Sequence, residues 1–143
     1  MGVIYERRHT RLIAEYGGLA KIMPQYAVLF MVVTLSSIGL PGLNGFVGEF
    51  LVLVGAFKAK VVYGVVAASG VVLAAVYLLW MYQRVFFGEV TVDANKKLID
   101  LASTEKMILV LIVIFIVWIG VHPSTFLGLS ENSVRMVMGR LGG

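Results

Sequence analysis

Long apolar runs alternate with short polar segments along this chain. Three runs are candidates for membrane crossings, at about residues 25–58, 61–83 and 106–122. A hydrocarbon core about 30 Å thick takes roughly 20 helical residues, so the second run is long enough. The third is slightly short and would need local bilayer thinning, or burial of residues 124–127 in the interface. The pattern predicts an all-α, polytopic membrane protein with residues 1–143 in a single membrane unit.

The first run is too long for one straight crossing, and it is interrupted near its middle. Proline removes a backbone donor and disfavours helix at the preceding residue, and glycine permits backbone angles closed to other residues. We therefore expect a discontinuous helix, broken at residues 39–45. The residues that form the break are Gly39, Pro41, Gly42 and Gly45. Short polar side chains expected to bond the freed backbone carbonyls are Thr34, Ser36, Ser37 and Asn44.

Glu49 is the one carboxylate between residues 25 and 58, and it follows the break by about one helical turn. A charge at membrane depth is costly unless it faces protein or water, so Glu49 beside a broken helix indicates an ion or proton path. The positive end of the second half-helix favours the ionised carboxylate, whereas burial favours the neutral acid. A proton carrier needs these two effects to balance. If the helical register held, Gly42, Gly45 and Glu49 would share one face.

Two alternatives to a transport role stay open at this point. A membrane glutamate can be the structural partner of a Lys or Arg on a neighbouring helix. Gly-Pro breaks are also found as simple packing kinks.

Composition agrees with a membrane environment, because 59% of the residues are hydrophobic and only 14% are charged, against roughly a quarter in soluble domains. The net charge of +4 does not indicate nucleic acid, since the basic residues lie outside the apolar runs, where they contact lipid headgroups. The absence of cysteine excludes disulfides, thiolate-held clusters and catalytic thiols. With only His9 and His122 available, we expect no metal or haem site in this chain.

The distribution of positive residues predicts the orientation, if the broken helix counts as one crossing. Lys and Arg are enriched in cytoplasmic loops. The segments before the first run and between the second and third runs lie on one side of the membrane, called side one. This side carries eight positive residues, Arg7, Arg8, Arg11, Lys21, Arg84, Lys96, Lys97 and Lys106. The opposite side, side two, holds the segment between the first and second runs and the tail after the third. It carries four positive residues, Lys58, Lys60, Arg135 and Arg140. The N-terminal segment is therefore predicted to be cytoplasmic and the C-terminal tail outside, with Glu49 in the half-helix nearer the outer face.

The polar segments between the runs predict smaller elements. The apolar stub at residues 1–5 resembles the tail of a helix, so we expect the chain to be the C-terminal piece of a longer protein. Residues 11–21 have approximate helical spacing and predict a short interfacial element. Residues 88–106 are rich in charge and predict a water-facing loop with a short surface helix around Leu98.

Specific motifs give the chain a family resemblance that covers essentially its whole length. They include Arg8-His9-Thr10-Arg11, Tyr16-Gly17-Gly18-Leu19-Ala20, Met23-Pro24 and the run Gly39-Leu40-Pro41-Gly42-Leu43-Asn44-Gly45-Phe46-Val47-Gly48-Glu49-Phe50. The likeness continues through Phe86-Phe87-Gly88, Asp100-Leu101, Glu105 and Gly120. On these residues the chain resembles the subunit M (mitochondrial chain 4) family, the antiporter-like membrane subunits of proton-pumping NADH–quinone oxidoreductase, or respiratory complex I.

The resemblance implies discontinuous helices and a line of ionisable residues across the membrane. It implies that Glu49 handles protons during translocation coupled to quinone reduction. It also implies that other membrane subunits are the partners, while NAD, FMN, iron–sulfur clusters and quinone belong to other subunits. Related chains, including those of multisubunit cation/proton antiporters, commonly have Lys where this chain has Glu49.

The resemblance covers only the C-terminal portion of the family, so the earlier helices with its other ionisable residues are absent from this chain. A cation/proton antiporter subunit, or a structural remnant that packs against other membrane subunits, remains an alternative. The sequence upstream would contain further broken helices with lone Lys and Glu residues under either transport hypothesis. Companion iron–sulfur or flavin subunits would occur only if the chain belongs to an NADH–quinone oxidoreductase.

Overall fold

The computed structural model describes residues 2–141, apart from the side chains of residues 130, 132, 140 and 141. These residues contain no strand, in agreement with the predicted all-α class. One turn of 3-10 helix lies at Ile13–Glu15. The α-helices are Gly2–Arg8 (α1), Leu19–Ile22 (α2), Pro24–Ser37 (α3), Asn44–Ala59 (α4), Val61–Phe86 (α5), Asp93–Lys96 (α6), Ser103–Val121 (α7) and Ser124–Leu141 (α8).

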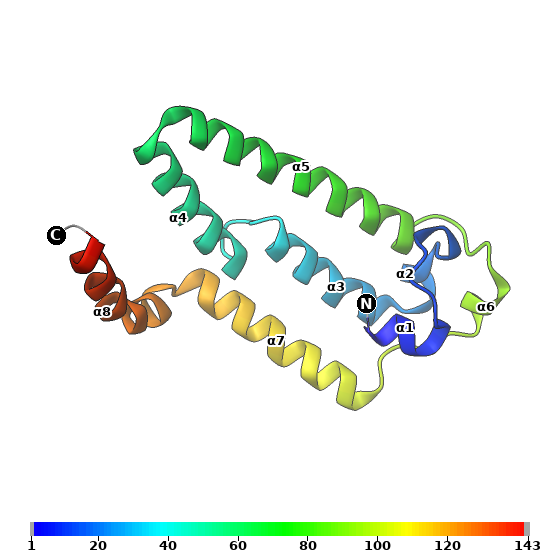
Figure 1. The fold of residues 1–143 in the computed structure, drawn as a ribbon. Coiled ribbons are helices and arrows are strands. Elements are labelled where there is room, and N and C mark those ends of the chain that lie inside the picture. The colour runs from blue at the N-terminus through cyan, green and yellow to red at the C-terminus, as the bar shows by residue number, and fades with distance from the viewer. Residues whose placement is uncertain (1, 142–143) are drawn as a thin grey trace.

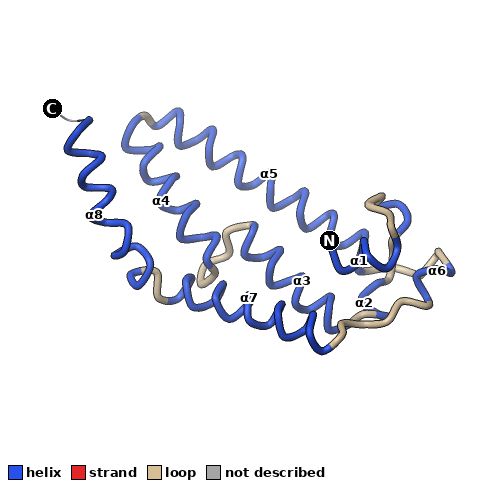
Figure 2. The backbone as a smooth tube through the Cα atoms, turned by 60° about the horizontal axis from the view of Figure 1, so that its bottom comes forward, coloured by secondary structure: helices blue, strands red, loops and turns tan. Residues whose placement is uncertain are grey.

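The first apolar run forms two helices rather than one. Helices α3 and α4 follow each other along the molecule and lie between α5 and α7 (Figures 1 and 2). Both contact α5 on one side and α7 on the other. The chain between them, residues 38–43, is not helical.

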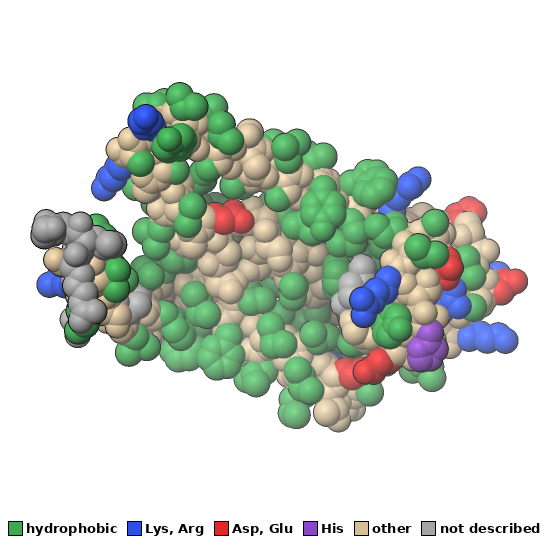
Figure 3. Space-filling model, in the orientation of Figure 1, with side chains coloured by type: hydrophobic (Ala, Val, Ile, Leu, Met, Phe, Trp, Pro, Cys, Tyr) green, Lys and Arg blue, Asp and Glu red, His purple; other side chains and the backbone are tan. Residues whose placement is uncertain are grey.

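Within the described residues, α5 and α7 are long and apolar enough to cross a membrane, and α3 is a shorter apolar helix. At 1.5 Å per residue, the 26 residues of α5 span about 39 Å and the 19 residues of α7 about 28 Å. Large apolar side chains cover their outer surfaces, as the space-filling view shows (Figure 3). Leu73, for example, is 68% exposed. Such a surface is stable only against lipid or other proteins.

Several helix boundaries differ from the predicted ones. Helix α7 begins three residues earlier than expected, because the Glu105 carboxylate accepts a hydrogen bond from Ala102 N (2.8 Å) and closes the first turn. The residues that this extension adds, Ser103, Thr104 and Glu105, are polar, so the apolar part of α7 is no longer than the sequence predicted. Helix α5 continues to Phe86, and the surface helix lies at α6 rather than around Leu98.

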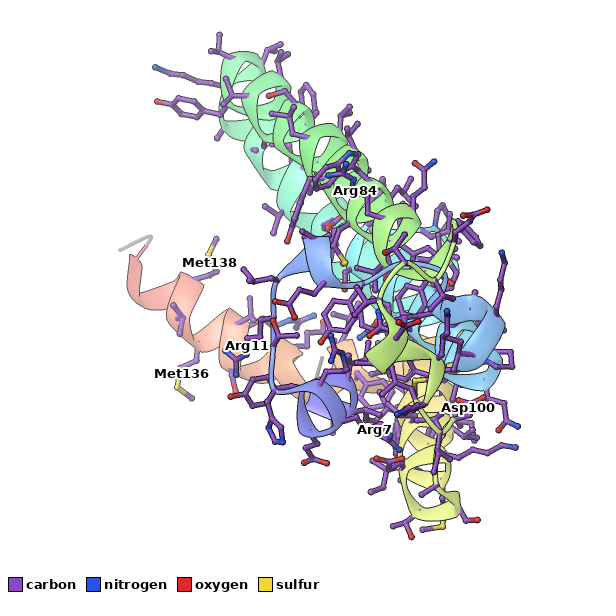
Figure 4. All side chains as sticks on the ribbon, turned by 90° about the vertical axis from the view of Figure 1, so that its right-hand side faces the viewer. Arg7, Arg11, Arg84, Asp100, Met136 and Met138 are labelled. Atoms are coloured by element: carbon purple, nitrogen blue, oxygen red, sulfur yellow. The ribbon has the colours of Figure 1, made fainter. Side chains whose placement is uncertain are left out.

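No helix was predicted after Pro123, where burial of residues 124–127 in the interface was one of two expectations. The segment forms α8, a helix of 18 residues that lies beyond the end of α7 (Figure 1). Its polar and apolar residues are mixed, with Glu131 and Arg135 paired at 2.6 Å across one turn. Met136 and Met138 project on different sides of α8 (Figure 4). The sequence signal was weak because glycine and polar residues interrupt the run.

The buried core of this chain lies at one end, where α1, α2, the start of α3 and the end of α5 meet. Leu19, Met23 and Phe86 are almost completely buried there. The Tyr82 hydroxyl donates to Ala27 O (3.0 Å), and its ring stacks on Phe86 with 4.5 Å between centroids. These contacts fix the start of α3 against the end of α5.

Polar contacts close the same end of the molecule. Arg7 donates two hydrogen bonds to Glu105, at 3.0 and 2.7 Å, and so joins α1 to α7. This pairing raises the pKa of Arg7 above its ordinary value, because the bonded carboxylate stabilises the guanidinium charge. Asp100 accepts hydrogen bonds from Gln25 N (2.9 Å) and Tyr26 N (3.2 Å) at the first turn of α3. Arg7 and Asp100 lie near each other at the beginning of α7 (Figure 4).

Candidate functional site: the break between α3 and α4

Helix α3 ends in a capping motif that its own sequence specifies. Leu40 N donates to Leu35 O (3.0 Å) and Gly39 N donates to Ser36 O (3.1 Å). This pair of bonds, with Gly39 at φ +78°, is a Schellman motif. Glycine adopts that left-handed conformation without the steric penalty of a Cβ atom. The end of α3 is therefore specified by residues that are close to it in the sequence.

The next four residues form a tight turn. Leu43 N donates to Leu40 O (3.1 Å), and the two central positions are Pro41 and Gly42, with Gly42 at φ +91°. Proline followed by a residue of positive φ is the signature of a type II turn. Helix α4 then begins at Asn44. The predicted break is thus a helix cap followed directly by a turn.

Side chains and backbone from the two helix ends meet across this turn. The Ser36 hydroxyl donates to Asn44 Oδ1, and Ser36 is buried. A Cβ atom at Gly45 would overlap the carbonyl of Ser36, so the backbones of α3 and α4 touch there. This close approach requires glycine at position 45.

The prediction that four polar side chains bond the freed carbonyls was wrong in detail. Thr34 donates to Phe30 O (2.8 Å) and Ser37 donates to Val33 O (3.0 Å), each within α3. Both hydroxyls therefore bond to the preceding turn of their own helix, a frequent behaviour of Ser and Thr in helices. Ser36 and Asn44 bond to each other across the break instead.

The Glu49 carboxyl group lies against the bare Cα of Gly39. A Cβ atom at Gly39 would overlap Glu49 Oε2 and Cδ, so no larger residue fits there without moving the carboxyl group. Side chains on a helix point toward its N-terminus, and Glu49 is in the second turn of α4, so its side chain reaches back to the break. The sequence placed these two residues in one region, and the fold brings them into contact.

The immediate surroundings of Glu49 contain no charge partner among the described side chains. Its carboxylate takes part in no hydrogen bond or ion pair with them, and the residue is partly buried. The nearby N-terminal turn of α4 contributes a positive partial charge. Within the described part of the chain, the Glu49 carboxyl group is therefore held against Gly39 and not by a salt bridge.

Helix α7 contacts the turn through a glycine that the sequence reasoning assigned no role. A Cβ atom at Gly120 would overlap Gly42 O and C and the Cα of Leu43. An isolated glycine inside an apolar helix lowers helix stability by about 1 kcal/mol relative to alanine. A glycine at such a position therefore indicates close packing, and this is the feature of the sequence that could have pointed to the contact. The partner in the contact is not apparent from sequence.

The structure separates the predicted glycine face into two parts. Gly42 lies in the turn and outside α4, so the helical register does not run from Gly42 to Glu49. Gly45 and Glu49 both belong to α4 and both face the end of α3. Pro41 is exposed at the tip of the turn.

No group of three or more His, Cys, Asp or Glu side chains that could hold a metal ion occurs among the described residues. The site therefore consists of one carboxyl group, a tight turn and close backbone contacts. This part of the chain offers no such group of metal ligands at the break.

Comparison with known proteins identifies the family of the chain. Residues 1–76 match the protein family described as NADH:quinone oxidoreductase/Mrp antiporter, TM. The chain belongs to this family. The match covers α1 to α4 with the whole break, and it ends within α5.

Named relatives extend the similarity over nearly the whole chain. NADH-quinone oxidoreductase subunit M of Rhodobacter capsulatus is 47% identical over 94% of this chain and 26% of its own length. NADH-ubiquinone oxidoreductase chain 4 of Arabidopsis thaliana is 42% identical over 94% of this chain and 27% of its own length. The chain thus spans about a quarter of the length of these relatives.

A solved structure has the same fold. A chain of respiratory complex I from Thermus thermophilus, determined with bound NADH, superposes with a TM-score of 0.80 at 38% identity. The superposition covers 87% of this chain and 26% of that chain. The family resemblance drawn from the sequence motifs is confirmed, as is the expected class of membrane helices.

Proposed function

We propose that this chain is part of an antiporter-like membrane subunit of a proton-pumping NADH:quinone oxidoreductase, and that Glu49 binds and releases protons during translocation. The observation that carries the proposal is the unpaired Glu49 carboxyl group against Gly39 at the break between α3 and α4. A carboxyl group without a salt bridge can gain or lose a proton without breaking an ion pair, and carboxyl groups of this kind are common at functional sites. The named relatives support the same assignment.

The proposed arrangement in the membrane has three crossings. Helices α3 and α4 together form the first, and α5 and α7 form the second and third. The cluster of basic residues at the end that holds α1, α2 and α6 supports a cytoplasmic N-terminal segment and an external α8. The lipid bilayer and other membrane subunits of the complex would then cover the exposed apolar surfaces of α5 and α7.

The chemistry in this chain is limited to proton transfer under this proposal. Electron transfer from NADH through FMN and iron–sulfur clusters to quinone would take place in other subunits. In the second candidate function, a multisubunit cation/proton antiporter, Glu49 would exchange protons for a cation. The family description includes such antiporters, whereas the named relatives above are NADH oxidoreductase chains.

Replacement of Glu49 by glutamine tests the proposal in the intact complex. Glutamine keeps the shape of the side chain but cannot carry a proton, so we expect proton pumping to fall roughly tenfold, equivalent to about 1.4 kcal/mol in barrier height. NADH-driven quinone reduction should fall with it, because the two processes are coupled. Both rates are measured in sealed membrane vesicles with a proton-sensitive dye and a quinone assay.

Glu89→Gln is the matched control, because Glu89 is exposed in the polar loop and undergoes the same chemical change. Wild-type pumping by the Glu49→Gln complex would disprove the proposal that Glu49 is a proton station, a residue that binds and releases protons during translocation. Pumping that depends on added Na⁺ or K⁺ and not on NADH would favour the antiporter function.

A further inference from the structure

Gly120 brings the backbone of α7 directly onto the turn of the break. The atoms that a Cβ at position 120 would overlap are Gly42 O, Gly42 C and the Cα of Leu43, all of them backbone atoms. A change of side-chain rotamer cannot relieve such an overlap. Any residue larger than glycine must therefore move either the turn or the end of α7.

The turn transmits such a movement to Glu49 through a short and rigid connection. Residues 40–43 are closed by the bond from Leu43 N to Leu40 O, and Leu40 N is bonded to Leu35 O. Gly39 lies directly before the turn and contacts the Glu49 carboxyl group. A displaced turn therefore changes the position of Gly39 relative to that carboxyl group.

Helix α7 is also held at its other end, which limits how far it can retreat. Arg7 binds Glu105 in the first turn of α7 with two hydrogen bonds, at 3.0 and 2.7 Å, and both side chains are partly buried. Paired hydrogen bonds between guanidinium and carboxylate are strong and directional. With its start fixed, α7 cannot easily slide away from a larger residue at position 120.

We propose that Gly120 is a positioning residue for the proton station. Its missing side chain lets α7, fixed by Arg7 at its other end, hold the turn so that the bare Cα of Gly39 faces the Glu49 carboxyl group. The inference rests on the proposed function of Glu49 and adds a distant residue that sets the environment of its carboxyl group.

Gly120→Ala in the intact complex is the direct test. We expect assembled complex with unchanged NADH oxidation by a water-soluble electron acceptor, a several-fold loss of proton pumping, and an altered pH profile of pumping. The altered profile separates this role from a structural one, because a smaller amount of intact complex lowers pumping equally at every pH. Gly70→Ala is the matched control, since it adds the same methyl group in α5, where a Cβ would meet no atom within 4 Å in this chain.

The double variant Glu49→Gln with Gly120→Ala tests whether the effect passes through Glu49. We expect it to pump no worse than Glu49→Gln alone, because coupled residues give non-additive effects. Additive losses would overturn the inference, as would wild-type pumping and pH profile in Gly120→Ala. If Glu49→Gln itself pumps normally, the proposed function fails and the inference fails with it. If Glu49→Gln is impaired but Gly120→Ala is not, only the inference fails.

A second variant decides the matter if Gly120→Ala does not assemble. Arg7→Ala releases the start of α7 without adding an atom at the break. We expect a reduced pumping rate with an altered pH profile, and no further loss when it is combined with Glu49→Gln. Unchanged pumping in Arg7→Ala would overturn the inference in that case.

Discussion

At the scale of single residues, Gly39 has two separate roles. Its φ of +78° closes the end of α3, and its missing Cβ leaves space for the Glu49 carboxyl group. Gly42 shares only the positive φ, which is +91°. A Cβ atom at Gly42 would meet no atom within 4 Å in this chain. The two glycines therefore allow backbone strain to be separated from displacement of the carboxyl group.

We predict that Gly39→Ala impairs proton pumping far more than Gly42→Ala. Each substitution forces a non-glycine residue into the left-handed region, at about 1 kcal/mol or more, but only the first also places a Cβ atom directly on the Glu49 carboxyl group. The measurement is the ratio of protons pumped to NADH oxidised in vesicles that contain each intact variant complex. Equal ratios for the two variants would show that contact with Gly39 is unimportant for Glu49.

At the scale of elements, the two ends of α3 are defined in different ways. Its C-terminal end is closed by neighbouring residues, as described above. Its N-terminal end has Pro24 in the first turn and no side-chain hydrogen bond from the preceding Met23. Asp100, far along the chain, supplies the missing acceptor for Gln25 N and Tyr26 N. This remote cap ties the start of α3 to the loop that leads into α7.

Loss of this remote cap should destabilise the end of the molecule that holds the core. We predict that Asp100→Ala lowers stability by about 1 kcal/mol, the usual value of a helix N-cap, and lowers the thermal denaturation midpoint of the solubilised complex. Asp93→Ala is the control, because Asp93 only pairs with Lys96 on the exposed surface, where such pairs contribute little. A midpoint for Asp100→Ala equal to that of the control would contradict the capping role.

At the scale of the whole molecule, the charged and apolar surfaces are segregated. Charged side chains gather at the end that holds α1, α2 and α6, while apolar side chains cover the lengths of α5 and α7 (Figure 3). The main hydrophobic cluster of this chain lies at the charged end. The outward faces of α5 and α7 stay exposed within this chain and need lipid or other proteins to cover them.

The proposed topology predicts opposite accessibility for the two ends. The chain contains no cysteine, so single cysteines at Lys97 and at Ser133, both exposed, report their own side of the membrane. We expect a membrane-impermeant maleimide to label the Lys97→Cys complex only from the cytoplasm and the Ser133→Cys complex only from outside. Labelling of both positions from the same side would contradict an odd number of crossings between them.

Much of the break was predictable from local sequence. Gly39 followed by Pro41 is a strong signal for the end of a helix, and Pro41-Gly42 is a strong signal for a turn. The predicted hydrogen bonds from Thr34 and Ser37 were wrong, because a hydroxyl in a helix has a carbonyl of its own helix within reach. Helix α8 was missed, because its mixed polar and apolar residues form no continuous apolar run.

The sequence by itself determined where the chain enters apolar surroundings, where the first run breaks, and that Glu49 follows the break. These features depend on side-chain polarity and on the backbone preferences of glycine and proline, which act over a few residues. Only the tertiary structure decided that Gly120 packs on the turn, that Asp100 caps α3 and that Arg7 anchors α7. These pairs lie more than 70 residues apart, and their contacts depend on how the helices pack, which no local pattern specifies.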